Sequence, residues 1–234
     1  MLKNEERSEI PGSIIISTKD LIADLESGGG DVVAQYNLAA FYTNGLTMDV
    51  DYDKAYYWCK KAADGGLSEA KYYLAMMLIN SISVKQNLKN AVSNLKLAGY
   101  GDENRAQFTL GVLHMLGKGV EKSKDKAFVF FEMAARSGHV RALYNLAIMY
   151  ECGIGVRKNH KESVRILKIA AGYGSEDAKK LQSNPNNNMD LDIGFKEMDC
   201  IIDLSEDGYM RPINPEDWAE SESLSIECTS TTVH

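Results

Sequence analysis

Residues 106–142 read AQFTLGVLHMLGKGVEKSKDKAFVFFEMAARSGHVRA, and this stretch matches the chain on either side of it when it is shifted by 36 positions. Two rows of recurring residues show the period most clearly. Alanine stands at 34, 70, 106, 142 and 178, and leucine stands at 38, 74, 110 and 146. A fixed period of roughly 20 to 50 residues is the sequence mark of a repeat array. The chain is therefore predicted to be built from repeats of 36 residues.

Each repeat contains two segments with helical spacing. In the fourth copy, Ala142, Leu146 and Met149 would share one face of a first helix. The turn at 153–155 contains two glycines, and a second apolar segment then runs to Gly174, where glycine readily adopts the left-handed conformation that ends a helix. One such hairpin cannot bury its own apolar face, whereas stacked neighbours can. The expected fold is an all-α solenoid of helix-turn-helix units.

The recurring pattern A-x-x-x-L-G-x-x-Y-x-x-G-x-G-V-x-x-x-x-x-K-A-x-x-W-x-x-x-A-A-x-x-G resembles the Sel1-like repeat family, a relative of the tetratricopeptide repeats. The third and fourth copies match best. Copy one has Thr47 in place of the second turn glycine, and copy two has Ser81 to Val84 in the turn and Asn94 in place of the aromatic residue. The resemblance covers residues 17 to 181. It implies a right-handed α-solenoid whose surface binds other proteins.

The period divides the chain into three parts. Residues 1–16 are expected to be a lead-in, because Pro11 and Gly12 would break a helix there. Residues 17–182 form the solenoid, with a leading half-unit, four full units and a trailing helix. No proline lies within it, which favours uninterrupted helices. Residues 183–234 form an acidic C-terminal appendage.

The appendage differs in charge from the rest of the chain. It holds twelve acidic residues against Lys196 and Arg211, a net charge of −10, whereas residues 1–182 carry +3. Acidic tails are usually solvated and disordered. Alternating apolar residues at 189–195 and 198–204 favour strands, however, and Asn214 to Trp218 reads as a helix start. A small ordered appendage and a disordered end both stay open.

Composition points to a soluble protein of the cytoplasm. The chain is 44% apolar and 25% charged, and the longest early apolar run, Ile14 to Ile16, is far too short to span a membrane. Residues 1–10 mix charges without an apolar core, so no secretory signal is expected. The cysteines share no C-x-x-C spacing and no zinc pattern, and the paired cysteines of secreted family members are missing; the four thiols are Cys59, Cys152, Cys200 and Cys228.

Residue patterns typical of catalysis are scarce, so we predict a chain that is not an enzyme and that uses no cofactor, metal or small-molecule substrate. His114 takes the place of an aromatic residue and is expected to pack rather than to act as a ligand. The glycines at 28–30 lack the Lys-Ser/Thr of a phosphate loop. Nucleic acid is disfavoured because the chain carries a net charge of −7 and has no basic cluster longer than two residues.

A concave groove is the candidate binding surface. By analogy with tetratricopeptide arrays, the first helix of each unit lines the concave side, and its aromatic and methionine side chains would suit a peptide or partner helix. The alternative is that these aromatic residues pack between neighbouring units. The candidate partner-binding residues are Tyr36, Asn37, Ala40, Tyr72, Met76, Phe108, Val112, Met115, Tyr144, Asn145 and Ile148.

The favoured function is a non-catalytic interaction module that binds another protein or peptide in or beside this groove. Two roles fit it, a scaffold or adaptor and a bacterial immunity protein that neutralises a toxin, the second implied by the resemblance. Two other classes stay open. One is an enzyme of the β-lactam-hydrolysing kind, which the resemblance also suggests, and the other is a structural homo-oligomer. No membrane partner is expected.

Overall fold

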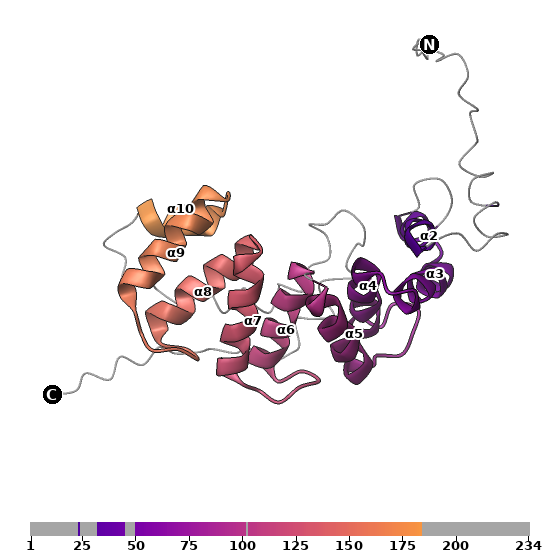
Figure 1. Ribbon diagram of the computed structural model, residues 1–234, viewed down its shortest axis with the longest axis horizontal. Helices are drawn as coiled ribbons and strands as arrows, with labels where there is room; N and C mark the ends of the chain where they lie inside the picture. Colours follow the sequence, from indigo (N-terminus) through magenta and orange to yellow (C-terminus); the bar gives the residue numbers. More distant parts are fainter. Residues whose placement is uncertain (1–22, 24–31, 45–49, 102, 184–234) are drawn as a thin grey trace, which may run out of the picture.

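The computed structural model describes residues 23, 32–44, 50–101 and 103–183. These ranges contain nine helices and no strand (Figure 1). The helices are α2 (Val32–Asn44), α3 (Tyr52–Asp64), α4 (Ser68–Ile79), α5 (Leu88–Tyr100), α6 (Asn104–Leu116), α7 (Lys124–Arg136), α8 (Val140–Cys152), α9 (His160–Gly172) and α10 (Glu176–Ser183).

Consecutive helices form hairpins that stack in sequence order. The pairs α2 and α3, α4 and α5, α6 and α7, and α8 and α9 pack within units, while α3 packs on α4, α5 on α6 and α7 on α8 (Figure 1). This arrangement confirms the predicted all-α solenoid with a period of 36. Helix α10 packs on α9 in the place of a fifth first helix. Apart from Ala23, the expected lead-in and leading helix lie outside the described residues, as does the appendage from residue 184 onward.

The second helix of every unit begins with the same cap. Residues 51, 87, 123 and 159 are Asp, Asn, Ser and Asn, and each accepts a hydrogen bond from the backbone N–H three residues later, at 3.0 to 3.3 Å. Such caps satisfy a donor that the helix leaves unpaired. The same four residues donate their own N–H to a carbonyl near the end of the preceding helix, at 2.8 to 3.1 Å. This fixes the turn inside each unit.

The turns inside units two, three and four also contain two left-handed residues each. Glycine fills both positions in unit three (Gly117 and Gly119) and in unit four (Gly153 and Gly155), all at positive φ. In unit two the same positions hold Ser81 (φ 57°) and Ser83 (φ 61°). Unit two therefore keeps the backbone conformation of the turns in units three and four without their glycines. Its Ser83 Oγ donates a hydrogen bond to Asp53 of the preceding unit.

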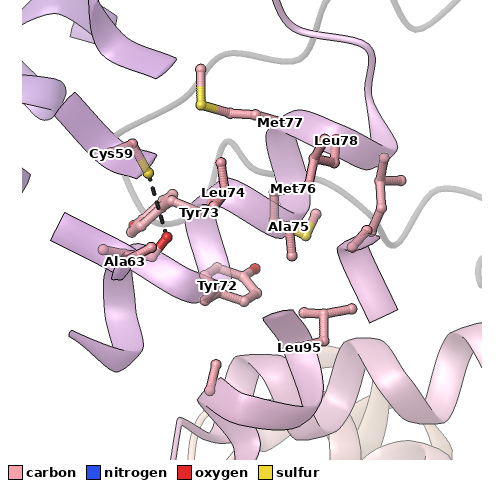
Figure 2. Packing of buried hydrophobic residues seen from close by; sticks show 14 of the residues in the cluster. Cys59, Ala63, Tyr72, Tyr73, Leu74, Ala75, Met76, Met77, Leu78 and Leu95 are labelled. Atoms are coloured by element: carbon pink, nitrogen blue, oxygen red, sulfur yellow. Dashed lines mark hydrogen bonds between the residues drawn. The ribbon is translucent and has the colours of Figure 1, made fainter. Parts of the chain in front are cut away.

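The core follows the stack of first helices. Nearly every residue of α4, α6 and α8 between the first and last turns is buried, whereas each second helix keeps an exposed face. Figure 2 shows Tyr72, Leu74 and Met76 of α4 among the buried side chains of the N-terminal core cluster. Helix α6 joins the two core clusters, because Leu110 packs in the N-terminal one and Phe108 in the C-terminal one. Within the described ranges, no helix is long and apolar enough to cross a bilayer.

Candidate functional site

The structure places most of the predicted partner-binding residues inside the protein. Tyr36 and Ala40 are half-buried and Asn37 is exposed, but the other eight side chains are at most 9% exposed. The buried eight are Tyr72, Met76, Phe108, Val112, Met115, Tyr144, Asn145 and Ile148. A role in partner binding stays a prediction for all eleven residues.

Contacts between units account for this burial. The ring of Phe108 stacks on His139, at the start of the next unit, with 4.4 Å between centroids. The guanidinium of Arg105, also one unit onward, lies 4.7 Å from the ring centroid of Tyr72. Both aromatic rings are therefore covered by the unit that follows, which matches the alternative expectation that they pack between neighbours.

Tyr36 takes part in a similar contact at the N-terminal end. Its ring centroid lies 5.6 Å from that of Tyr73. Burial, together with the neighbouring Tyr73, raises the pKa of the Tyr36 phenol well above its usual value. The Tyr73 hydroxyl in turn accepts a hydrogen bond from Arg105, at 3.0 Å. These groups therefore form a structural network across three units.

A solvent-open groove lies instead between α7, α8 and α9, with a volume of about 820 Å³. We call it the α7–α9 groove. Its lining residues are Glu132, Ala135, Arg136, Ser137, Gly138, Leu143, Leu146, Tyr150, Glu162, Arg165, Ile166, Ile169 and Tyr173.

The α7–α9 groove has an apolar floor. Leu143 and Leu146 of α8 and Ile166 of α9 are buried in the core cluster beneath it, and each forms part of the lining. Ile169 is half-buried, and Tyr173, just beyond α9, is 63% exposed. The apolar surface that a ligand could cover in this concave place therefore comes mainly from Ile169 and Tyr173, with the three buried side chains beneath them.

Two ion pairs form the rim. On α7, Arg136 Nη2 donates to Glu132 Oε1 at 2.9 Å, and on α9, Arg165 Nε donates to Glu162 Oε1 at 3.0 Å. The hydrogen bond from Arg165 lowers the pKa of the Glu162 carboxyl below its ordinary value. The rim therefore offers both a cation and an anion on each side of the apolar floor.

Tyr150 brings a polar group into the same groove. Burial raises the pKa of its phenol, and the carboxylates of Glu132 and Glu162 raise it further. The ring packs edge-on against Phe128, with 5.3 Å between centroids. Its hydroxyl can donate a hydrogen bond to a ligand in the groove.

Side-chain volume distinguishes the α7–α9 groove from the corresponding place one unit earlier, between α5, α6 and α7. The residue that corresponds to Ile166 is Phe130, whose larger ring stacks on His114 with 5.4 Å between centroids. Gln107, which corresponds to Leu143, reaches across to the carbonyl of Gly99 at 3.0 Å. The corresponding place between α5, α6 and α7 therefore carries a larger side chain and a bridging hydrogen bond.

The histidines of the described region have structural contacts. His114 Nδ1 lies 3.1 Å from the Glu121 carbonyl, His139 accepts from the Ala142 N–H at 3.2 Å, and His160 pairs with Glu151 at 2.8 Å. Within the same residues, no group of three or more His, Cys, Asp or Glu is placed to hold a metal ion.

Two cysteines, Cys59 and Cys152, lie in the described region. Cys59 is completely buried, and its Sγ lies 3.4 Å from the Ala70 carbonyl (Figure 2). Burial raises the pKa of the Cys59 thiol to about 12. A thiol with so high a pKa is almost entirely protonated at neutral pH and is therefore a poor nucleophile.

Sequence reasoning missed the α7–α9 groove. The signal available was Tyr173, a large aromatic residue placed directly before the glycine that ends the unit. The remaining lining residues occupy repeat positions that are filled by apolar or charged residues in other units as well. Their sequence pattern therefore does not distinguish them.

Comparison with known proteins agrees with this geometry. A family model described as the Sel1 repeat matches residues 32–67, 68–102, 104–139 and 140–172. A Sel1 repeat protein from Oxalobacter formigenes aligns over 68% of this chain and 65% of its own, with 24% identity and a TM-score of 0.64. The protein c5321, a protective antigen of uropathogenic Escherichia coli strains with an SLR fold, aligns over 86% and 55%, with 22% identity and a TM-score of 0.51.

These two structures share the fold with this chain, and the aligned region is less than two thirds of the length of either. No curated protein matches the chain in sequence. The four matched repeats together cover more than half of the chain and coincide with the four stacked hairpins. The chain therefore belongs to the Sel1 repeat family.

Proposed function

We propose that this chain is a non-catalytic interaction module that binds a partner protein in the α7–α9 groove. Sel1 repeat proteins are generally protein–protein interaction scaffolds, and the family is generally non-enzymatic. The observation that carries the proposal is the groove itself, which is open to solvent between charged rims and is lined by Ile169 and Tyr173 above the buried side chains of Leu143, Leu146 and Ile166.

The lining defines the chemistry of the partner. A helix or loop with one or two large apolar side chains would fill the floor, since buried apolar and aromatic anchors contribute most of the binding energy of an interface. Flanking charges of either sign can pair with Arg136 and Arg165 or with Glu132 and Glu162. The Tyr150 hydroxyl would donate to a backbone carbonyl or a polar side chain of the partner.

Among the possible roles, we place the chain as a cytoplasmic scaffold or adaptor. The sequence, which lacks the paired cysteines of secreted family members, supports a reducing location. A toxin-neutralising immunity role stays a prediction from the sequence, and it differs in requiring one dedicated partner bound with a single stoichiometry. We propose that neither hydrolysis of β-lactams nor self-assembly is the function.

The experiment compares partner capture by three versions of the full chain. The wild type, a groove variant (Ile169→Asp with Tyr173→Ala) and a control variant (Tyr57→Ala) are immobilised, and bound proteins from the native host are quantified by mass spectrometry. Tyr57 is also a largely exposed aromatic residue, but it lies on α3, far along the array from the groove. Circular dichroism verifies that all three are folded.

The proposal predicts proteins that are captured by the wild type and the control but lost with the groove variant. A partner found in this way is then purified and titrated against each version by calorimetry. Loss of one or two apolar anchors should weaken binding by about 2–4 kcal/mol. Equal binding to all three versions would overturn the groove as the binding surface, and hydrolysis of a chromogenic β-lactam by the wild type would overturn the non-catalytic role.

A further inference from the structure

The turns inside the units form a continuous edge of the solenoid. A Cβ atom built on Gly119 would lie 2.8 Å from the Cβ of Leu88, at the start of α5, and one built on Gly155 would lie 2.3 Å from the carbonyl oxygen of Lys124, at the start of α7. Each turn therefore lies directly against the second helix of the preceding unit. We call residues 80–90, 117–126 and 153–162 the turn edge.

The turn edge concentrates positive charge. Its three segments contain nine lysines and arginines against three carboxylates, a net charge of +6. Residues 1–182 together carry only +3, so the remainder of that region is net negative. Eight of the nine cations are exposed, and they are Lys85, Lys89, Lys122, Lys124, Lys126, Arg157, Lys158 and Lys161.

The three carboxylates of the edge offset part of this charge, and two more contact its residues, since Asp53 accepts a hydrogen bond from Ser83 and Glu151 lies 2.8 Å from His160. Glu162 is hydrogen-bonded by Arg165, which lies outside the three segments. Glu121 lies 4.0 Å from Lys126, and both side chains are largely exposed. Exposed pairs of this kind are weak and screened by water. A chain of cations thus extends across three units and presents a positive surface to an approaching polypeptide.

The end of the described structure leads toward this edge. Helix α10 occupies the positions that lie 36 residues after 140–147, which are the first turns of α8. Helix α8 runs five residues further, about 8 Å, before it reaches its turn at Gly153. Helix α10 therefore points toward the edge that carries the turn at Gly153, and the seven residues from Ser183 to Asp190 can span at most about 23 Å.

The segment that begins there carries the opposite charge. Residues 190–207 contain seven acidic residues and one basic residue, Lys196, a net charge of −6. From its charge, its reach and its tether, we propose that residues 190–207 dock in cis along the turn edge, with carboxylates against the lysines of units three and four. A tethered segment of this kind acts at a high effective concentration, so that modest charge pairs suffice to hold it.

Docking of this segment would give the protein two separate surfaces. The α7–α9 groove stays free for a partner, while the positive edge is occupied by the chain's own acidic segment. Another acidic polypeptide would then reach the edge only by competing with the tether. This inference is independent of the proposed partner in the groove, since none of the cations of the turn edge lines the groove and Glu162 alone belongs to both surfaces.

Paramagnetic relaxation tests the proposal in the full chain. A spin label is attached to Cys200, inside the acidic segment, in a protein with Cys152→Ser and Cys228→Ser; Cys59 is buried and stays unlabelled. Amide signals of residues 118–126 and 155–161 should lose intensity relative to the reduced, diamagnetic label. Signals of the opposite edge, at 136–139 and 172–174, should keep their intensity.

Two charge-reversal variants give a matched comparison. Lys122→Glu with Lys158→Glu removes cations from the turn edge, and Lys96→Glu with Lys168→Glu makes the same change in net charge on exposed positions of α5 and α9. The intensity loss should disappear in the first variant and in about 1 M NaCl, where the Debye length falls to about 3 Å. It should persist in the second variant.

Several outcomes would overturn the proposal. Unchanged amide intensities along the turn edge would show that the segment does not dock there. Loss of intensity around the α7–α9 groove would place the segment on the other surface. Equal behaviour of the two charge variants would show attraction without a defined site. Intensity loss that appears only when labelled protein is mixed with an isotopically labelled second copy would show docking between molecules.

Discussion

Gly111 of α6 faces the ring of Phe131 on α7 so closely that a Cβ atom at residue 111 would lie 2.7 Å from the Cδ1 and Cε1 atoms of the ring. Phe131 is completely buried. The other units place alanine at the first position and a smaller side chain at the second, in the pairs Ala39 and Cys59, Ala75 and Leu95, and Ala147 and Leu167. In unit three, the smaller residue on α6 thus makes room for the larger side chain on α7.

This exchange predicts coupled stabilities. Gly111→Ala should lower the free energy of unfolding by about 1–3 kcal/mol, because Phe131 cannot move away within a packed core. Phe131→Leu alone leaves a cavity and should also destabilise. The double variant recreates the pair of unit four and should be more stable than Gly111→Ala alone. Guanidinium unfolding of all four proteins measures the coupling, and simple additivity would show that the two residues do not share this space.

The serines of the second turn predict a stabilising change. Ser81 adopts φ of 57°, a left-handed conformation that disfavours residues with a Cβ atom. Ser81→Gly should therefore raise the free energy of unfolding by about 0.5–1 kcal/mol, after the extra flexibility of glycine in the unfolded chain is subtracted. The matched reverse change, Gly153→Ser in unit four, should lower it by a similar amount. A loss of stability in Ser81→Gly would contradict the strain assigned to this turn.

Contact between turns predicts unequal effects at two glycines. Gly155 and Gly138 both have positive φ, but a Cβ atom at Gly155 would lie 2.3 Å from the Lys124 carbonyl oxygen, whereas one at Gly138 meets nothing within 4 Å. Gly155→Ala should destabilise more than Gly138→Ala by about 1–3 kcal/mol, because it combines backbone strain with a steric clash. Thermal denaturation of the two variants measures the difference. Equal losses of stability would show that the clash with the Lys124 carbonyl oxygen makes no contribution.

The buried thiol of Cys59 predicts that stability falls in alkaline solution. Its pKa is about 12 in the folded protein, against an ordinary value of 9.0. Well below pH 9 the thiol is protonated in both the folded and the unfolded state, so it contributes no pH dependence to the free energy of unfolding. Above pH 9 the unfolded chain loses its proton first, so the free energy of unfolding falls by about 1.4 kcal/mol per pH unit from this residue alone.

The variant Cys59→Ala isolates this contribution. Tyr36, whose pKa is also raised, should keep part of the alkaline slope in both proteins. Denaturant unfolding at several pH values above 9 should give a shallower slope for Cys59→Ala than for the wild type, whatever the offset between the two. Equal slopes for the two proteins would contradict the prediction, because they would show that the Cys59 thiol loses its proton at the same pH in the folded and the unfolded state.

The fold could be predicted from sequence because the same physical constraint recurs in every unit. Alanine at 34, 70, 106, 142 and 178 lets helices approach closely, and a spacing of 36 that holds across the array is typical of stacked hairpins. The turn of unit two is harder to predict in this way. Its serines weaken the sequence pattern, yet the neighbouring caps and stacked turns hold the family conformation.

The candidate surfaces could not be predicted from the repeat pattern. A groove depends on how side-chain volumes compare between neighbouring units, and the difference between Ile166 and Phe130 is visible only once α7, α8 and α9 are placed together. The positive turn edge is equally hidden, because its cations come from three segments spaced by the repeat. Along the chain, none of these segments is a basic run longer than two residues.

Hydrogen exchange of the chain with its purified partner tests the central claim most directly. Occupation of the α7–α9 groove predicts slower amide exchange in peptides covering 132–138 and 162–173, with little change in peptides from α2 and α4. Protection confined to residues 36–43 and 72–79, with none around the groove, would contradict the account and restore the first helices as the binding surface.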